Sequence, residues 1–128
     1  MNPKAIGEIS EALVLARLIK LGHKVLLPFG NNQRYDLVID HGAAFERVQV
    51  KTGRIRKGAV VFNTSSINGF TRQRRAYNQD VDAFCVYCPD NDKVYKIPIA
   101  VCGPRSKNLS LTKERTRVGC ELATEYEI

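Results

Sequence analysis

Residues 34–52 read RYDLVIDHGAAFERVQVKT, and this stretch decides the fold. Two runs rich in β-branched and aromatic residues, 35–40 and 45–51, are separated by a short connection at 41–44 that contains glycine. This pattern is typical of two strands joined as a hairpin. We therefore expect the two runs to pair as antiparallel neighbours in a sheet.

Antiparallel pairing brings the start of the first run next to the end of the second. Asp36 would then lie beside Gln49 and Lys51 at one edge of the sheet. Side chains alternate between the two faces of a strand, so Gln49 and Lys51 share one face while Val48 and Val50 share the other. The polar face of the second strand thus ends next to a carboxylate.

A helix is expected before the hairpin, at 6–21. Apolar residues recur there at helical spacing, and Gly22 stands where a helix ends. Glu8 and Glu11 are three positions apart, so both carboxylates lie on one face near the start of the helix. A short strand at 23–28 and a turn at 29–34 lead into the hairpin.

The rest of the chain is expected to add further strands and little helix. Strands are predicted at 60–63, 83–87 and 94–97, a loop or short helix at 65–80 with Phe70 and Tyr77 as candidate anchors, an ambiguous apolar segment at 99–101, and a weakly packed tail from 105. One helix followed by several strands indicates an α/β or α+β domain. At 128 residues, the chain fits a single domain over 1–128.

The composition, 44% hydrophobic, is that of a globular protein. The sequence shows neither a signal-peptide pattern nor an apolar run near the ~20 residues of a membrane span, so we expect a cytoplasmic protein. Cys85 and Cys88 have the spacing of a zinc or redox pair, but they lie in an apolar run and have no second pair. We interpret them as core residues.

Positive charge is concentrated in one block. The formal net charge is +7, and no acidic residue occurs between Glu46 and Asp80, where eight Lys and Arg residues lie. Such a block is suited to neutralising the phosphates of double-stranded DNA, although a solvated basic face would have the same composition. The candidate DNA-contacting residues are Arg54, Arg56, Lys57, Asn63, Arg72, Arg74 and Arg75.

The polar residues at the sheet edge have the chemistry needed for phosphodiester hydrolysis. Carboxylate and carbonyl oxygens are the ligands of Mg²⁺ or Mn²⁺, and Lys51 could hold a water or stabilise negative charge. We expect catalytic roles for Glu8, Glu11, Asp36, Gln49 and Lys51, with Glu11, Asp36, Gln49 and Val50 as the metal ligands.

Each of these residues also has a simpler interpretation. Glu8 and Glu11 could be ordinary acids stabilised by the helix dipole. Asp36 could cap a turn, and Lys51 could be a surface charge. Only the ordered set along the chain favours a site.

That ordered set resembles a known family. Gly7-x-x-x-Glu11, then Asp36, then Gln49-x-Lys51 is similar to the PD-(D/E)xK nucleases, and within them to the small group I intron homing endonucleases of cyanobacterial type. The resemblance implies a restriction-endonuclease-like core in which a central mixed β-sheet is flanked by helices. It also implies metal-dependent cleavage of duplex DNA by an oligomer, and the small surface of one subunit predicts a homodimer or homotetramer.

The sequence departs from the family pattern twice. Tyr35 stands where many members have proline, and Gln49 stands where most have Asp or Glu. Three functions stay open: a site-specific homing endonuclease, which we favour, a structure-selective nuclease similar to the Holliday-junction resolvases, and a DNA-binding module that Gln49 has made inactive.

Overall fold

The predicted hairpin forms the middle of a five-stranded sheet in the computed structural model, which describes residues 1–30, 33–67, 70–77 and 79–128. Strands β2 (Leu37–Asp40) and β3 (Phe45–Thr52) are antiparallel, with Leu37 opposite Val48. The order is β1-β2-β3-β8-β9, in which β1 spans Lys24–Leu26, β8 Ala83–Cys88 and β9 Lys93–Pro98. Only β3 and β8 run parallel, so the sheet is mixed, as expected.

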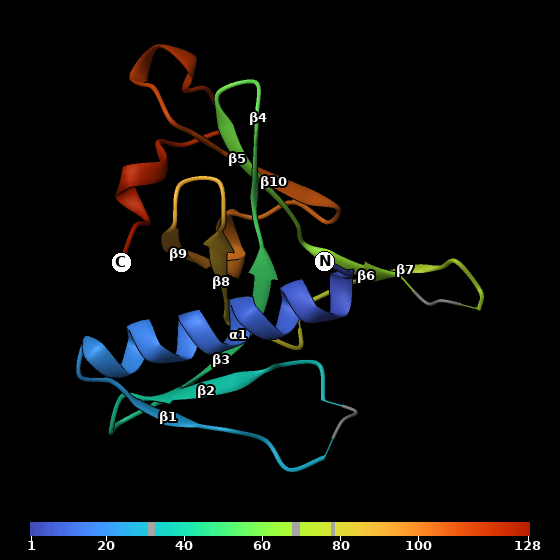
Figure 1. Cartoon of the computed structure of the whole chain (residues 1–128), viewed down its shortest axis with the longest axis vertical. Coiled ribbons are helices and arrows are strands. Elements are labelled where there is room, and N and C mark those ends of the chain that lie inside the picture. Colours follow the sequence, from blue (N-terminus) through green and yellow to red (C-terminus); the bar gives the residue numbers. More distant parts are fainter. Residues whose placement is uncertain (31–32, 68–69, 78) are drawn as a thin grey trace.

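Helix α1 (Pro3–Lys20) covers one face of this sheet (Figure 1). It begins three residues before the predicted start because the Asn2 side chain accepts a hydrogen bond from the Ala5 amide at 2.9 Å, and proline is well tolerated in the first turn. It ends before Gly22, whose φ of 92° is readily adopted only by glycine. The core between helix and sheet contains Val14, Leu18, Leu37, Ile39, Val48, Val50, Cys85 and Val94.

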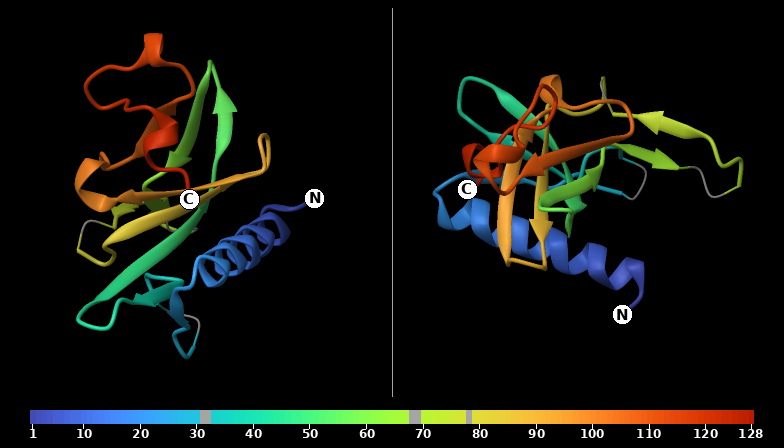
Figure 2. Two further views of the ribbon diagram at one scale, coloured as in Figure 1. Left: turned by 90° about the vertical axis from the view of Figure 1, so that its left-hand side faces the viewer. Right: turned by 90° about the horizontal axis from the view of Figure 1, so that it is seen from above.

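The opposite face is covered by a second sheet and not by helices, so the expectation of flanking helices is wrong. Strands β4 (Arg54–Arg56), β5 (Ala59–Asn63) and β10 (Ser106–Ser110) form it in the order β10-β5-β4. Apart from α1, the helical segments among the described residues are three short 3-10 turns, at Ile99–Val101, Lys113–Arg115 and Ala123–Glu125. Figure 2 shows α1 on one side of the strands and the C-terminal segments on the other.

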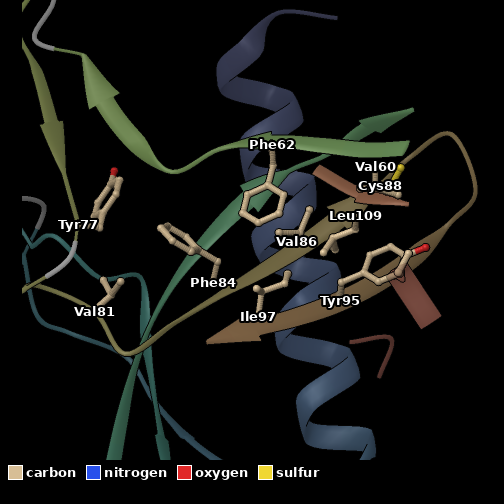
Figure 3. Packing of buried hydrophobic residues seen from close by; sticks show 11 residues of the cluster. Val60, Phe62, Tyr77, Val81, Phe84, Val86, Cys88, Tyr95, Ile97 and Leu109 are labelled. Atoms are coloured by element: carbon tan, nitrogen blue, oxygen red, sulfur yellow. The ribbon is translucent and has the colours of Figure 1, made fainter. Parts of the chain in front are cut away.

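A second hydrophobic core joins the two sheets (Figure 3). It forms because the outward face of β8 is apolar, with Phe84 and Val86 fully buried. The ring of Phe62 from β5 meets Phe84 edge-on, with ring centroids 5.8 Å apart. Burying one such aromatic side chain contributes about 1.5–3 kcal/mol, so this core helps to hold the two sheets together.

Gly53 is the point at which the chain passes from the first sheet to the second. Its amide donates to the Tyr87 carbonyl at 2.8 Å. A Cβ at this position would stand 2.8 Å from Val86 Cγ1 and 3.0 Å from Val60 Cγ1. Glycine is therefore required here by the close approach of the two sheets.

The segment 65–80 is not the loop or short helix that we expected. Most of it is a hairpin of β6 (Ser65–Ile67) and β7 (Arg74–Ala76), which are paired over three residues. Tyr77 is buried, as expected of an anchor, but Phe70 is fully exposed. The predicted turn at 29–34 and this segment also include residues 31–32, 68–69 and 78, which lie outside the described part of the chain.

The tail from residue 105 is packed more firmly than predicted. Leu109 of β10 is fully buried, and Lys107 is 3% exposed. The Lys107 ammonium contacts the Glu121 carboxylate at 2.5 Å, which fixes the last segment to the second sheet. Within the described residues, no helix is long and apolar enough to cross a membrane.

All four cysteines are free. Cys85 packs in the core beside α1 and Cys88 in the core between the sheets, because they are three positions apart on one strand. The two thiols therefore point to opposite faces and do not form a chelating pair, which agrees with their interpretation as core residues.

Candidate active site

Asp36 stands at the head of β2, where the hairpin register fixes it. Its amide donates to the Val48 carbonyl at 2.8 Å, and its Oδ2 accepts a hydrogen bond from the Val50 amide at 2.8 Å. The carboxylate is thus held by the neighbouring strand, close to the position predicted from the antiparallel pairing.

Helix α1 brings Glu11 to this carboxylate. Next to it, the buried Ser10 hydroxyl hydrogen-bonds the Thr52 hydroxyl at 2.6 Å, which ties this turn of the helix to β3. Burial raises the pKa of Glu11 to about 7, with further contributions from the charge of Asp36, a hydrogen bond to it, and the charge of Glu8. Two carboxyl groups from different elements therefore meet, and the Glu11 carboxyl titrates near neutral pH.

Lys51 approaches Asp36 from the opposite face of the sheet. Its Nζ donates to the Ser65 carbonyl at 3.4 Å and lies 4.7 Å from the centre of the Tyr77 ring. Burial lowers the pKa of Lys51, the positive charge of Arg34 lowers it further, and the negative charge of Asp36 opposes both. The Lys51 side chain is thus half-buried, and its ammonium is held in place by contacts with Ser65 and Tyr77.

Gln49 is half-buried on the same face of β3 as Lys51. Its Nε2 lies 3.5 Å from the Val50 carbonyl oxygen. The side-chain oxygen of Gln49 and that carbonyl oxygen are neutral oxygens of the kind that bind Mg²⁺. Glu8 is exposed on α1 and contributes negative charge beside Glu11.

This donor set fits a hard divalent cation. The charge of Asp36 helps to raise the pKa of Glu11, a cation bound between the two carboxyl groups would offset that repulsion, and amide oxygens can complete the coordination. The described residues contain no group of three His, Cys, Asp or Glu side chains able to share an ion. A cation at this site would therefore need neutral oxygens besides the carboxylates of Glu11 and Asp36.

A cleft of about 390 Å³ opens beside these carboxylates. Glu11 and Asp36 line it together with apolar side chains of α1 and of the segment that connects β1 to β2, among them Leu15 and Leu27. A substrate therefore has access to the carboxylates from this side.

The candidate DNA-contacting residues are all exposed and lie on two hairpins. Arg54, Arg56, Lys57 and Asn63 belong to the β4–β5 hairpin, and Arg72, Arg74 and Arg75 to the β6–β7 hairpin. The two hairpins extend from the body of the protein in different directions (Figure 1). Arg47, in the same basic block, is instead paired with Asp82 at 3.2 Å.

Sequence reasoning missed three residues that support the site: Ser10, Arg34 and Thr52. Arg34 bonds to the base of the β6–β7 hairpin, and its guanidinium lies 4.0 Å from the centre of the Tyr77 ring. No local pattern marks such partners, since they are 32 to 42 positions apart in sequence. Tyr77 was expected only as an anchor.

Comparisons with known proteins agree with this geometry. The family model described as "PD-(D/E)XK endonuclease" matches residues 1–128. Among solved structures, the bacterial homing endonuclease I-Ssp6803I superposes with a TM-score of 0.77 at 27% sequence identity, over 99% of this chain and 89% of the other. No curated protein matches the chain.

Proposed function

Because the chain belongs to the PD-(D/E)XK endonuclease family, we propose that it is a site-specific DNA endonuclease of the homing type that uses Mg²⁺. The observation that carries this proposal is the meeting of the Glu11 and Asp36 carboxyls beside Lys51, at the end of the central strands. The similarity to a homing endonuclease over nearly the whole chain supports the choice among nucleases.

The residues at the site would divide the work between binding and proton control. Glu11, Asp36, the Gln49 side-chain oxygen and the Val50 carbonyl would hold Mg²⁺, or Mn²⁺ in its place. The cation would supply charge neutralisation at the scissile phosphate and acidify a water molecule. Lys51 would orient the attacking water and stabilise the negative charge that develops on the phosphate oxygens. Glu8 would increase the negative potential that attracts the cation.

The exposed cations of the two hairpins would bind duplex DNA. A projecting hairpin can enter a groove and present Arg, Asn and Gln side chains to base edges, whereas a junction-selective enzyme needs a flatter basic surface. The shape therefore favours sequence-specific cleavage over junction resolution. Thr64 and Ser65, at the junction of the two hairpins, are buried and would not take part.

We also propose that the enzyme acts as a homodimer or homotetramer, since one small domain offers little surface for a long recognition site. Large apolar side chains are exposed on edge strand β1 and after it, including Leu26, Leu27 and the fully exposed Phe29. Free cysteines fit the cytoplasm as its location. A mass measurement in solution, with and without DNA, would define the assembly.

The decisive experiment compares cleavage of supercoiled plasmids and of a four-way junction, each with Mg²⁺ and with EDTA. We expect cuts at few plasmid sites in Mg²⁺, none in EDTA, and none by Asp36→Asn at unchanged DNA affinity. Cleavage in EDTA would refute metal dependence. Cleavage of the junction alone would indicate a structure-selective nuclease, and DNA binding without any cleavage would indicate an inactive module.

A further inference from the structure

Arg34 joins the β6–β7 hairpin to the strand that carries Asp36. Its Nε donates to Asp80 Oδ2 at 3.0 Å and its Nη1 to Ser66 Oγ at 2.5 Å. Its Nη2 donates to the backbone carbonyls of Ala76 at 2.8 Å and Arg75 at 3.3 Å. All three guanidinium nitrogens are therefore bonded within the protein, and this arginine is not presented to DNA as the exposed ones are.

Tyr77 connects the same arginine to the active-site lysine. The Arg34 guanidinium carbon lies 4.0 Å and the Lys51 ammonium 4.7 Å from the centre of the tyrosine ring. The ring itself is 5% exposed and meets Phe84 edge-on at 5.7 Å, so the core holds it in place. Lys51 also donates to the carbonyl of Ser65, the first residue of the hairpin.

The hairpin needs such an anchor. Its strands are paired over only three residues and form a sheet of two strands, which is marginal in water without further packing. Arg34 and Tyr77 are among the contacts that hold it on the protein, and Tyr77 lies beside Lys51. A shift at the base of the hairpin would move the groups that contact the Lys51 ammonium.

We propose that Arg34 and Tyr77 are positioning residues that join the DNA-contacting β6–β7 hairpin to Lys51, so that seating the hairpin on DNA places the lysine for catalysis. This inference rests on the proposed nuclease function. It predicts that a poorly seated hairpin slows the chemical step and does not only weaken binding. Discrimination between sites would then be expressed partly in the cleavage rate at saturating protein.

The test separates the rate at saturating protein from affinity, on a duplex fragment that the parent cuts. Arg34→Gln and Tyr77→Leu should lower the single-turnover rate by about 10- to 100-fold, while the Kd in EDTA changes less than about threefold. Tyr77→Phe keeps the aromatic ring that Tyr77→Leu lacks, so it should keep most of the parent's rate. The matched control is Arg17→Gln, because Arg17 also donates to a distant backbone carbonyl, that of Ile128 at 2.9 Å. It should lower thermal stability and leave the rate near that of the parent.

An NMR measurement gives a readout that needs no DNA cleavage. It reports the surroundings of Lys51 in any variant that is still folded. The aromatic ring should shift the Lys51 Cε resonance upfield in the parent and in Tyr77→Phe, and Tyr77→Leu should lose this shift. Ser66→Ala, which removes one partner of Arg34, should show intermediate effects on both shift and rate. Failure of the parent to cut any DNA would overturn the proposed function, and the NMR series would still test the linkage.

Three results would overturn the inference. Tyr77→Leu could cut at the parent's rate at saturation, or Tyr77→Phe could be as slow as Tyr77→Leu, which would assign the effect to the hydrogen bond between the Tyr77 hydroxyl and Ser66 and not to the ring beside Lys51. Alternatively, Arg34→Gln could lose affinity with an unchanged rate, which would make Arg34 a DNA contact.

Discussion

The hydroxyl pair between α1 and β3 gives a sharp prediction about stability. Thr52→Val keeps the shape of the side chain but removes the partner of the Ser10 hydroxyl, which is 1% exposed and 2.6 Å away. Leaving a buried hydroxyl without a partner costs about 1–3 kcal/mol. A helical serine can turn back to the carbonyl four residues earlier, which offsets part of that penalty. We therefore expect Thr52→Val to lower the free energy of unfolding by about 1–2 kcal/mol.

Ser10→Ala should cost less than Thr52→Val, because Thr52 is only half-buried and water can replace its lost partner. The double variant leaves no unsatisfied hydroxyl, so its loss should fall short of the sum of the single losses by about 1 kcal/mol. Urea unfolding of the four proteins, monitored by circular dichroism, measures the cycle. Thr52→Ser serves as the control, since it keeps the hydroxyl. Additive losses, or a Thr52→Val variant within about 0.3 kcal/mol of the parent, would refute the reasoning.

Three further predictions concern the proposed site. Because Glu11 is protonated below its raised pKa of about 7, Mg²⁺ affinity measured by calorimetry should increase between pH 6 and pH 8 and become flat in Glu11→Gln; an equally flat profile in the parent would contradict this. Gln49→Glu should keep or tighten Mg²⁺ binding with activity kept in part, whereas Gln49→Ala should cut slowly in single-turnover assays across a Mg²⁺ titration. If Gln49→Ala matches the parent at every Mg²⁺ concentration, Gln49 is not part of the site. Replacing the three hairpin arginines with alanine should reduce the salt dependence of DNA binding by about one unit of slope per lost phosphate contact; an unchanged slope would place the binding surface elsewhere. These arginines are Arg72, Arg74 and Arg75.

The sequence was informative wherever a local pattern determined the structure. Alternation in residues 45–51 predicted which side chains share a face, and the short connection at 41–44 predicted the antiparallel pairing that brings Asp36 to the end of β3. The family resemblance was confirmed by the match over the whole chain. The meeting of Glu11 with Asp36 followed from the resemblance and not from any spacing, since 25 positions separate them.

What the sequence did not reveal depends on contacts between distant segments. Leu109 lies in a polar stretch that indicates a loose tail, and it becomes a core residue only because β10 pairs with β5. The sequence pattern therefore did not distinguish the second sheet from the expected layer of helices. Similarly, the basic stretch 65–80 has too few apolar residues to indicate strands, and its hairpin depends on Arg34 from another part of the chain.

Gly53 also has a consequence for how this enzyme could be redesigned. It follows the proposed catalytic strand end directly and precedes the β4–β5 hairpin, and its surroundings leave no room for a side chain. It acts as a fixed link between the sheet that carries the candidate active site and the β4–β5 hairpin. A redesigned variant could exchange the β4–β5 hairpin to alter the proposed DNA recognition sequence, but it should keep Gly53. If the β4–β5 hairpin reads bases as proposed, a bulkier residue at position 53 should change the distance along DNA between the bases read and the bond cut.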